Sequence, residues 1–331
     1  MSEKGLRRLV VLSDCHFGDG SALLTREDLV RRLLAELGQA GEIDLLVLLG
    51  DIWDLWSSGF GAAAAAGAPF FRALSAWEAP RECVFVAGNH DYHLWTACED
   101  RRARREAGWE EVEGVSLGLV QEESCSERIC LFEDLPLWVH YPLLRVEVGG
   151  RSVLFMHGHH LDFFSASFWW AKTAWLARWM LGRARGVALS DIDRLNKPFF
   201  ELLTQTAHVA ELREWEYRFY ACLRFFARLL RFQSRSGGSP RRLTSVQQNN
   251  GEAEELLRDF LPGFIPDVFV FGHTHRAGFS RIAVGGAPLL LVNSGCWVEG
   301  SGDETGMTYL VIDDAIRLRR LGGEEMTLGY P

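Results

Sequence analysis

Residues 9–16 read LVVLSDCH, an apolar run followed at once by an aspartate and a histidine. A short run of Leu and Val without polar alternation is typical of a strand that is buried on both faces. The same construction returns as LLVLLGD over 45–51, as CVFVAGNHD over 83–91 and as VFVFGHTH over 268–275. Apolar residues at helical spacing over 26–37 separate the first two runs. This alternation of strands and helices predicts a sheet covered by helices.

A second group of strands is predicted further along the chain. The runs 137–148 and 152–156 flank Gly149-Gly150, which favours a tight hairpin turn because glycine adopts positive φ easily. Residues 289–292 and 308–312 are further apolar runs. The sequence therefore predicts an α/β fold of two packed sheets with helices outside.

Composition places the chain among ordinary globular proteins. Its 331 residues allow a sizeable core, and 48% of them are hydrophobic. The net charge of −9 lacks the basic footprint of non-specific nucleic-acid binding, so no nucleic-acid partner is expected. The seven cysteines are scattered, which favours reduced thiols and a cytoplasmic location. The N-terminal apolar run is short and enters an acidic motif, so it is interpreted as a strand and not as a signal peptide.

Polar motifs stand at the ends of the predicted strands. They are Asp14-Cys15-His16, Gly50-Asp51, Gly88-Asn89-His90-Asp91, His157-Gly158-His159-His160 and Gly272-His273-Thr274-His275. Ligands of α/β sheets collect beyond the carboxyl ends of the strands, so these motifs are expected to converge at one edge. Carboxylates, imidazoles and an amide suit Mn²⁺, Fe, Zn²⁺ or Mg²⁺, and the oxygen ligands favour the harder ions.

The order D-x-H, G-D, G-N-H-D, a later His-rich motif and G-H-x-H resembles the calcineurin-like metallophosphoesterase family. The resemblance spans residues 14 to 275 and implies a four-layer α/β/β/α sandwich with two divalent metal ions, Mn²⁺ first among the candidates. It implies one metal held by Asp14, His16, Asp51 and His275, and a second held by Asp51, Asn89, His157 and His273. Asp51 would bridge the two ions with one carboxylate oxygen on each.

The same resemblance implies roles for the neighbours of these ligands. His90 would not be a ligand and would stand near the leaving group as proton donor or charge stabiliser. Asp91 would orient the His90 ring and fix its tautomer. Two adjacent cations would lower the pKa of a shared water and neutralise charge on phosphoryl oxygens. Hydrolysis of a phosphoester or pyrophosphate bond is therefore predicted.

The sequence leaves more than one role open for several other residues near the motifs. His159 could touch substrate or support the ligands from behind, and Asp54 could orient a ligand or cap the chain in solvent. Asn293 and Ser294 could belong to a loop near the metals. Cys15 is interpreted as a small filler that faces away from the ligands. Ordinary structural roles are expected for His93, His140 and His208.

The middle of the chain differs in composition from the rest. Within 165–245, fourteen Lys and Arg residues oppose six Asp and Glu residues, and aromatic residues are dense. Such asymmetry marks a separate segment. We therefore expect a helical, basic and aromatic lid over 161–245, inserted into a metallophosphoesterase core made of 1–160 and 246–331.

The composition of this lid suggests a class of substrate. Residues 163–181 read FFSASFWWAKTAWLARWML, in which Lys172 and Arg178 interrupt an apolar stretch. An interfacial helix fits this pattern better than a membrane span, and it favours peripheral contact with anionic lipid at the inner face of the membrane. Arg178 and Arg183 would bind phosphate groups of an amphiphile. The alternative is a helical subdomain whose aromatic residues pack on one another.

The lid resembles one branch of the family, the UDP-2,3-diacylglucosamine hydrolases of lipid A synthesis. The stretch GDIWDLW over 50–56 is similar to that branch. Two motifs depart from it: the branch commonly has G-N-R-D where this chain has Gly88-Asn89-His90-Asp91, and H-G-D where this chain has His157-Gly158-His159. The leading hypothesis is hydrolysis of a lipid-linked or nucleotide-sugar substrate such as UDP-2,3-diacylglucosamine. The alternatives are a soluble phosphatase or phosphodiesterase acting on a nucleotide or small phosphoester, and a non-catalytic metal-binding scaffold.

Overall fold

The computed structural model describes most of the chain outside the predicted lid. The described residues are 6–39, 41–77, 80–106, 125–131, 135–163, 204, 246–300 and 306–331. Almost all of the lid, with Arg178 and Arg183, lies outside these residues, so its structure stays a prediction. Within the described part of the chain, no helix is both long enough and apolar enough to cross a bilayer.

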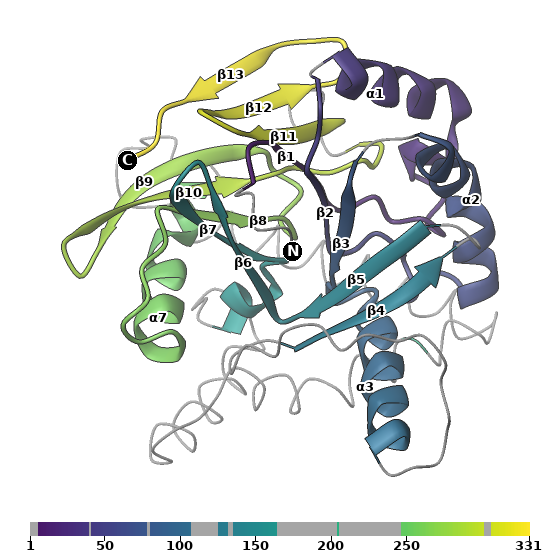
Figure 1. Cartoon of the computed structure of the whole chain (residues 1–331), viewed down its shortest axis with the longest axis horizontal. Helices are drawn as coiled ribbons and strands as arrows, with labels where there is room; N and C mark the ends of the chain where they lie inside the picture. The colour runs from purple at the N-terminus through teal and green to yellow at the C-terminus, as the bar shows by residue number, and fades with distance from the viewer. Residues whose placement is uncertain are drawn as a thin grey trace, which may run out of the picture.

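An eight-stranded sheet forms the larger half of the fold (Figure 1), in the order β13-β12-β11-β1-β2-β3-β5-β4. Its parallel centre consists of β1 (Leu9–Leu12), β2 (Leu45–Leu49), β3 (Glu82–Val86) and β5 (Leu135–Tyr141). Antiparallel strands flank this centre: β4 (Cys125–Leu131), β11 (Thr308–Ile312), β12 (Ile316–Arg320) and β13 (Glu325–Leu328). The parallel strands send their carboxyl ends to a common edge.

A five-stranded sheet packs against the first, in the order β6-β7-β8-β10-β9. Its strands are β6 (Leu143–Val148), β7 (Arg151–Met156), β8 (Val268–Phe271), β9 (Gly278–Val284) and β10 (Ala287–Asn293). The predicted hairpin turn joins β6 to β7, with φ of 57° at Gly149 and 77° at Gly150. The run 137–148, predicted as one strand, is divided between the two sheets at Pro142, which has no N–H to donate to a ladder.

Helices cover the outer face of each sheet. The larger sheet carries α1 (Glu27–Gln39), α2 (Phe60–Ala76) and α3 (Tyr92–Glu106), and the smaller one carries α7 (Asn250–Phe260). The described elements also include three short 3₁₀ helices, η1 (Leu23–Thr25), η2 (His159–Phe163) and η3 (Val246–Asn249). Figure 1 shows α1 and α2 on the opposite side of the molecule from α7. The predicted four-layer α/β/β/α arrangement is confirmed.

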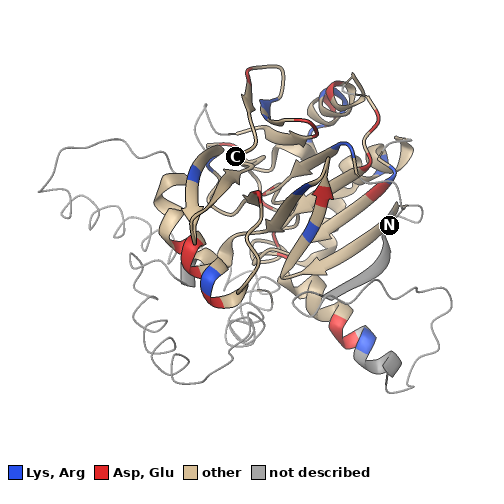
Figure 2. Ribbon diagram, turned by 60° about the vertical axis from the view of Figure 1, so that its left-hand side comes forward, with Lys and Arg blue, Asp and Glu red and all other residues tan. Residues whose placement is uncertain are grey.

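The strand β1 shows why the central strands are apolar throughout. Val10 and Leu12 pack toward the helices, whereas Leu9 and Val11 pack between the two sheets. All four side chains are buried, so neither face of this strand can carry a polar residue without cost. Figure 2 shows the consequence: the central strands are almost free of charged residues, which lie on helices such as α7 and on outer strands such as β12 and β6.

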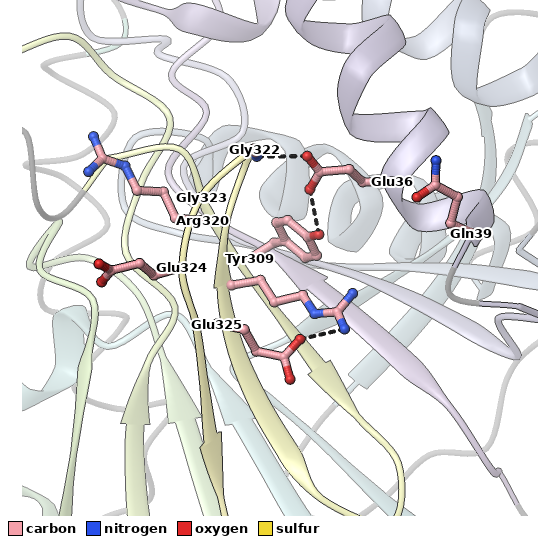
Figure 3. A pocket seen from close by; sticks show the side chains of 9 residues that line it. Glu36, Gln39, Tyr309, Arg320, Gly322, Gly323, Glu324 and Glu325 are labelled. Atoms are coloured by element: carbon pink, nitrogen blue, oxygen red, sulfur yellow. Dashed lines mark hydrogen bonds and ion pairs between the residues drawn. The ribbon is translucent and has the colours of Figure 1, made fainter.

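A hollow of about 450 Å³ lies between the end of α1 and the turn that follows β12 (Figure 3). Its polar groups bind one another. Glu36 accepts hydrogen bonds from the Tyr309 hydroxyl at 3.0 Å and from the Gly322 N–H at 2.6 Å, and Arg319 pairs with Glu325 at 2.5 Å. The two Glu36 contacts tie α1 to the edge of the larger sheet, and the Arg319–Glu325 pair joins β12 to β13. None of the predicted ligands lines the hollow.

His140 on β5 provides a test of burial in the larger sheet. Burial lowers the pKa of its imidazole to about 4, whereas an unfolded histidine titrates near ~6.5. As the pH falls from about 6.5 toward 4, His140 becomes protonated in the unfolded chain but stays neutral in the folded chain. The contribution of His140 to stability is therefore complete above pH ~6.5 and is lost as the pH falls toward 4.

We predict that His140→Gln reduces the acid sensitivity of folding. Between pH 7 and 4.5 its free energy of unfolding, measured by urea denaturation, should fall by about 1–2 kcal/mol less than that of the parent. The exposed-site control Met326→Gln should keep the parental pH dependence. Equal slopes for His140→Gln and the parent would contradict this assignment.

Candidate metal centre

The polar motifs meet where β1, β2, β3, β7 and β8 end. The first three strands are parallel neighbours in the larger sheet, and β7 and β8 are parallel neighbours in the smaller one. Their carboxyl ends bring together side chains from residues 14 to 275. Ligand atoms that lie within 4.8 Å of one another form three overlapping groups: Asp14, His16 and His275; His16, Asp51 and His90; Asp51, His157 and His273.

Asp14, His16 and His275 form the first cluster. Nε2 of His275 lies 3.2 Å from Oδ1 of Asp14 and 3.0 Å from Nε2 of His16. Nδ1 of His16 lies 3.3 Å from Oδ2 of Asp54, which leaves its Nε2 for an ion. Two imidazole nitrogens and a carboxylate oxygen that face one point are a donor set for a divalent metal.

The second cluster contains buried acceptors that no hydrogen bond satisfies. Nδ1 of His157 lies 2.9 Å from the carbonyl oxygen of Leu49 and must donate, because a carbonyl only accepts. The lone pair of the neutral ring is therefore on Nε2, 3.1 Å from Oδ2 of Asp51. This Nε2 and Oδ1 of Asn89 are buried without a hydrogen-bond partner. Orphaned buried acceptors are rare, and a bound cation is what would satisfy them, so the residues fit a metal.

Asp51 belongs to both clusters through a single oxygen. Its Oδ2 lies 3.1 Å from Nε2 of His157 and 3.9 Å from Nε2 of His16. Its Oδ1 accepts the backbone N–H of His90 at 2.9 Å. The expectation of one oxygen on each ion stays a prediction, because an oxygen that accepts one N–H keeps a second lone pair for a cation.

Most of the predicted ligand residues have an unusual backbone conformation. Six described residues other than glycine have φ between 50° and 63°, and five of them are predicted ligands: Asp14, His16, Asp51, His273 and His275. The sixth is Met307. This left-handed region costs side-chain-bearing residues about 1–3 kcal/mol each and persists only where the surroundings impose it. Such strain at strand ends points to a site that needs these side chains turned inward.

Asn293 braces the loop that carries His273 and His275. Its Nδ2 donates to the carbonyl oxygen of Gly272 at 2.6 Å and to the hydroxyl of Thr274 at 3.1 Å. The sequence left a site role for Asn293 open, and the structure places this residue behind the ligands. It therefore holds the strained loop in place.

The partner of His90 is Asp54. Nδ1 of His90 lies 3.0 Å from Oδ1 of Asp54, and 23% of the His90 side chain is exposed. The sequence assigned this role to Asp91, which instead accepts the backbone N–H groups of Gly88 and Ile52, each at 2.7 Å. Asp91 thus joins the G-N-H-D turn to the G-D loop, and its oxygens are occupied by backbone donors.

The carboxylates make this edge strongly negative. Burial lowers the pKa of His157, but the charges of Asp51 and Asp14 outweigh it and raise that pKa to about 10. Burial also lowers the pKa of His90, and the charges of Asp54 and Asp51 raise it to about 9. Without a cation these charges favour a proton on Nε2 of His157, and a metal ion bound there would replace that proton.

His159 lies beside the second cluster. Its ring centroid is 5.7 Å from that of His157 and 6.4 Å from that of His273. Burial, together with the neighbouring His160 and His157, lowers the pKa of His159 well below its usual range, so the ring is neutral. Its Nε2 lies 3.3 Å from the Tyr141 hydroxyl. These ring contacts allow His159 to support the ligands His157 and His273. Contact of His159 with substrate stays a prediction.

Cys15, by contrast, packs in the core between the larger sheet and its helices. It faces away from the ligands, as the sequence predicted, and burial raises the pKa of its thiol well above the usual range.

Gly88 allows a test of the Asp51 position. A Cβ at Gly88 would collide with Oδ1 and with the backbone nitrogen of Asp51, and a backbone atom can move aside only at a cost. We predict that Gly88→Ala weakens Mn²⁺ binding about 10–100-fold in calorimetry, because Asp51 must shift. Gly61→Ala is the control, since a Cβ there meets nothing within 4 Å. Equal affinities in the two variants would show that Asp51 does not hold the ion.

Comparison with known proteins agrees with this site. The family described as calcineurin-like phosphoesterase matches residues 7–277, a range that includes every predicted ligand. No curated protein matches significantly.

Two solved structures are similar at low identity. A predicted phosphoesterase, a conserved uncharacterised protein from Streptococcus pneumoniae, has 12% identity and a TM-score of 0.32, covering 97% of this chain and 98% of that chain. A dimetal phosphatase from Danio rerio has 13% identity and a TM-score of 0.44, covering 99% of this chain and 100% of that chain. The family match, which extends over most of the chain, shows that this protein belongs to the calcineurin-like phosphoesterase family and is a metal-dependent phosphoesterase.

Proposed function

We propose that the chain hydrolyses a phosphoester or pyrophosphate bond with two divalent cations, Mn²⁺ before Fe, Zn²⁺ or Mg²⁺. The observation that carries this proposal is Oδ2 of Asp51, which faces His157 in one cluster and His16 in the other. When bound, the cations supply a hydroxide nucleophile near neutral pH and neutralise charge on the phosphoryl oxygens. One would be held by Asp14, His16, Asp51 and His275, and the other by Asp51, Asn89, His157 and His273.

His90 is the proton donor in this proposal. Asp54 occupies Nδ1 of its ring, so Nε2 is the atom left to protonate the leaving oxygen. The carboxylate of Asp54 also favours the imidazolium form, which is the form that can donate. General-acid catalysis of this kind contributes about 10²–10⁴-fold to the rate.

We further propose that the substrate is a lipid-linked or nucleotide-sugar molecule such as UDP-2,3-diacylglucosamine. The support is compositional: the segment 161–245 combines excess Lys and Arg with many aromatic side chains. Arg178 and Arg183 would contact phosphate groups, and the aromatic residues would meet acyl chains at the surface of an anionic membrane. A soluble phosphatase or phosphodiesterase is the competing function.

Asp51→Asn and His90→Gln separate a ligand from a proton donor. Asp51→Asn should lower the metal content, measured by elemental analysis, and slow hydrolysis of phenyl phosphate by about 10³-fold or more. His90→Gln should slow turnover by about 10²–10⁴-fold with metal content unchanged. Asp28→Asn, at an exposed position on α1, is the control. An Asp51→Asn protein as active as the parent would end the catalytic proposal, and metal loss in His90→Gln would make His90 a ligand.

Vesicle binding tests the substrate class. Flotation with vesicles containing phosphatidylglycerol should carry the chain to the top of a gradient, and detergent should change the rate of hydrolysis. Vesicles of neutral lipid are the control, because basic residues gain about 1 kcal/mol each only near an anionic surface. A chain that ignores anionic vesicles and detergent would support the soluble alternative instead.

A further inference from the structure

Trp56 lies flat against the ring of His90. The ring centroids are 4.0 Å apart and the planes differ by 27°. The ring of His16 meets the His90 ring edge-on, with centroids 4.8 Å apart and planes at 84°. Two aromatic neighbours, one on a face and one at an edge, therefore restrict how the His90 ring can turn.

The same carboxylate that binds His90 also places Trp56. Oδ1 of Asp54 accepts the backbone N–H of Trp56 at 3.1 Å and that of Ser57 at 2.9 Å. This is the local turn that aspartate side chains favour. The N–H of Leu55 donates to the carbonyl oxygen of His90 at 3.3 Å, which ties the two segments together a second time. Asp54 thus fixes both the imidazole and the loop that carries the indole.

We propose that Trp56 is a positioning residue for proton transfer by His90, an inference that rests on the proposed role of His90 as proton donor. A hydrogen bond at Nδ1 holds one atom of the ring and leaves the ring free to tilt about that atom. The flat indole removes this freedom on one face, so Nε2 stays at a single point. A donor must come within about 2.6–3.2 Å of the oxygen that it protonates, and a shift of about 1 Å can slow a reaction about 10²-fold.

Trp53, three residues earlier, shows that an aromatic residue in this segment need not serve the site. Its indole is buried and stacks on Phe71, with centroids 5.0 Å apart and planes at 9°. Trp56 is only partly buried and has the His90 ring as its stacking partner. Both indoles pack on the same core, and Trp56 differs in that one of its faces also meets the ring of His90.

The test compares two leaving groups. Nitrophenolate departs readily without a proton, whereas phenolate gains much from protonation. Trp56→Ala should therefore lower kcat for phenyl phosphate about 10–10²-fold and kcat for 4-nitrophenyl phosphate less than about threefold, with KM little changed. Trp56→Phe keeps a flat ring and should restore most of the rate. Trp77→Ala, at the partly buried end of α2, should leave both rates unchanged.

Three further measurements exclude a purely structural effect. In a His90→Gln background, Trp56→Ala should not change the ratio of the two rates again, because residues that act through one another are not additive. Without metal, the ring-proton resonances of His90 should move when Trp56→Ala removes the ring current of the indole. Metal content should equal that of the parent.

The outcomes separate this inference from the proposed function. A His90→Gln protein that slows both substrates equally would overturn proton donation by His90, and the role of Trp56 with it. If His90→Gln changes the ratio of rates and Trp56→Ala does not, proton donation stands and the positioning role is overturned. Loss of metal in Trp56→Ala, or unmoved His90 resonances, would also overturn it.

Discussion

The geometry of the site depends on one oxygen, Oδ2 of Asp51, that faces ligands from both clusters. It can do so because the chain occupies the other oxygen through the N–H of His90 and leaves no side chain at Gly88 to push the carboxylate aside. The remaining ligands surround this atom at the price of strained backbone at the strand ends. Apolar side chains packed on both faces of each sheet supply the stability that offsets this strain.

The fold was largely predictable because its central strands are apolar along almost their whole length. A continuous run such as Leu9–Leu12 has one physical interpretation, burial on both faces, and β2, β3 and β8 repeat it. The run 137–148 misled the prediction because its hydrophobicity continues through Pro142 while the ladder does not. Hydrophobic patterning reports burial, and it does not say which of two packed sheets buries a strand.

The site was predictable to the level of residue types at strand ends, and less so for their partners. Asp54 and Asp91 are both aspartates close to His90, and spacing alone could not say which carboxylate meets the imidazole. That choice depends on side-chain direction, since Asp91 turns toward backbone N–H groups and Asp54 turns toward two imidazoles. Trp56 could not be separated from Trp53 by sequence because both are apolar positions of one short segment.

Each cluster takes ligands from both sheets: Asp14 and His16 meet His275, and Asp51 meets His157 and His273. A cation held there would join two layers that otherwise meet through apolar packing and a few hydrogen bonds, such as the one from His157 to the carbonyl oxygen of Leu49. Binding of the cation would then stabilise the folded state, because the unfolded chain offers no such assembled ligand set. The concentration of the ion in the cell would consequently affect the lifetime of the folded chain as well as the rate of catalysis.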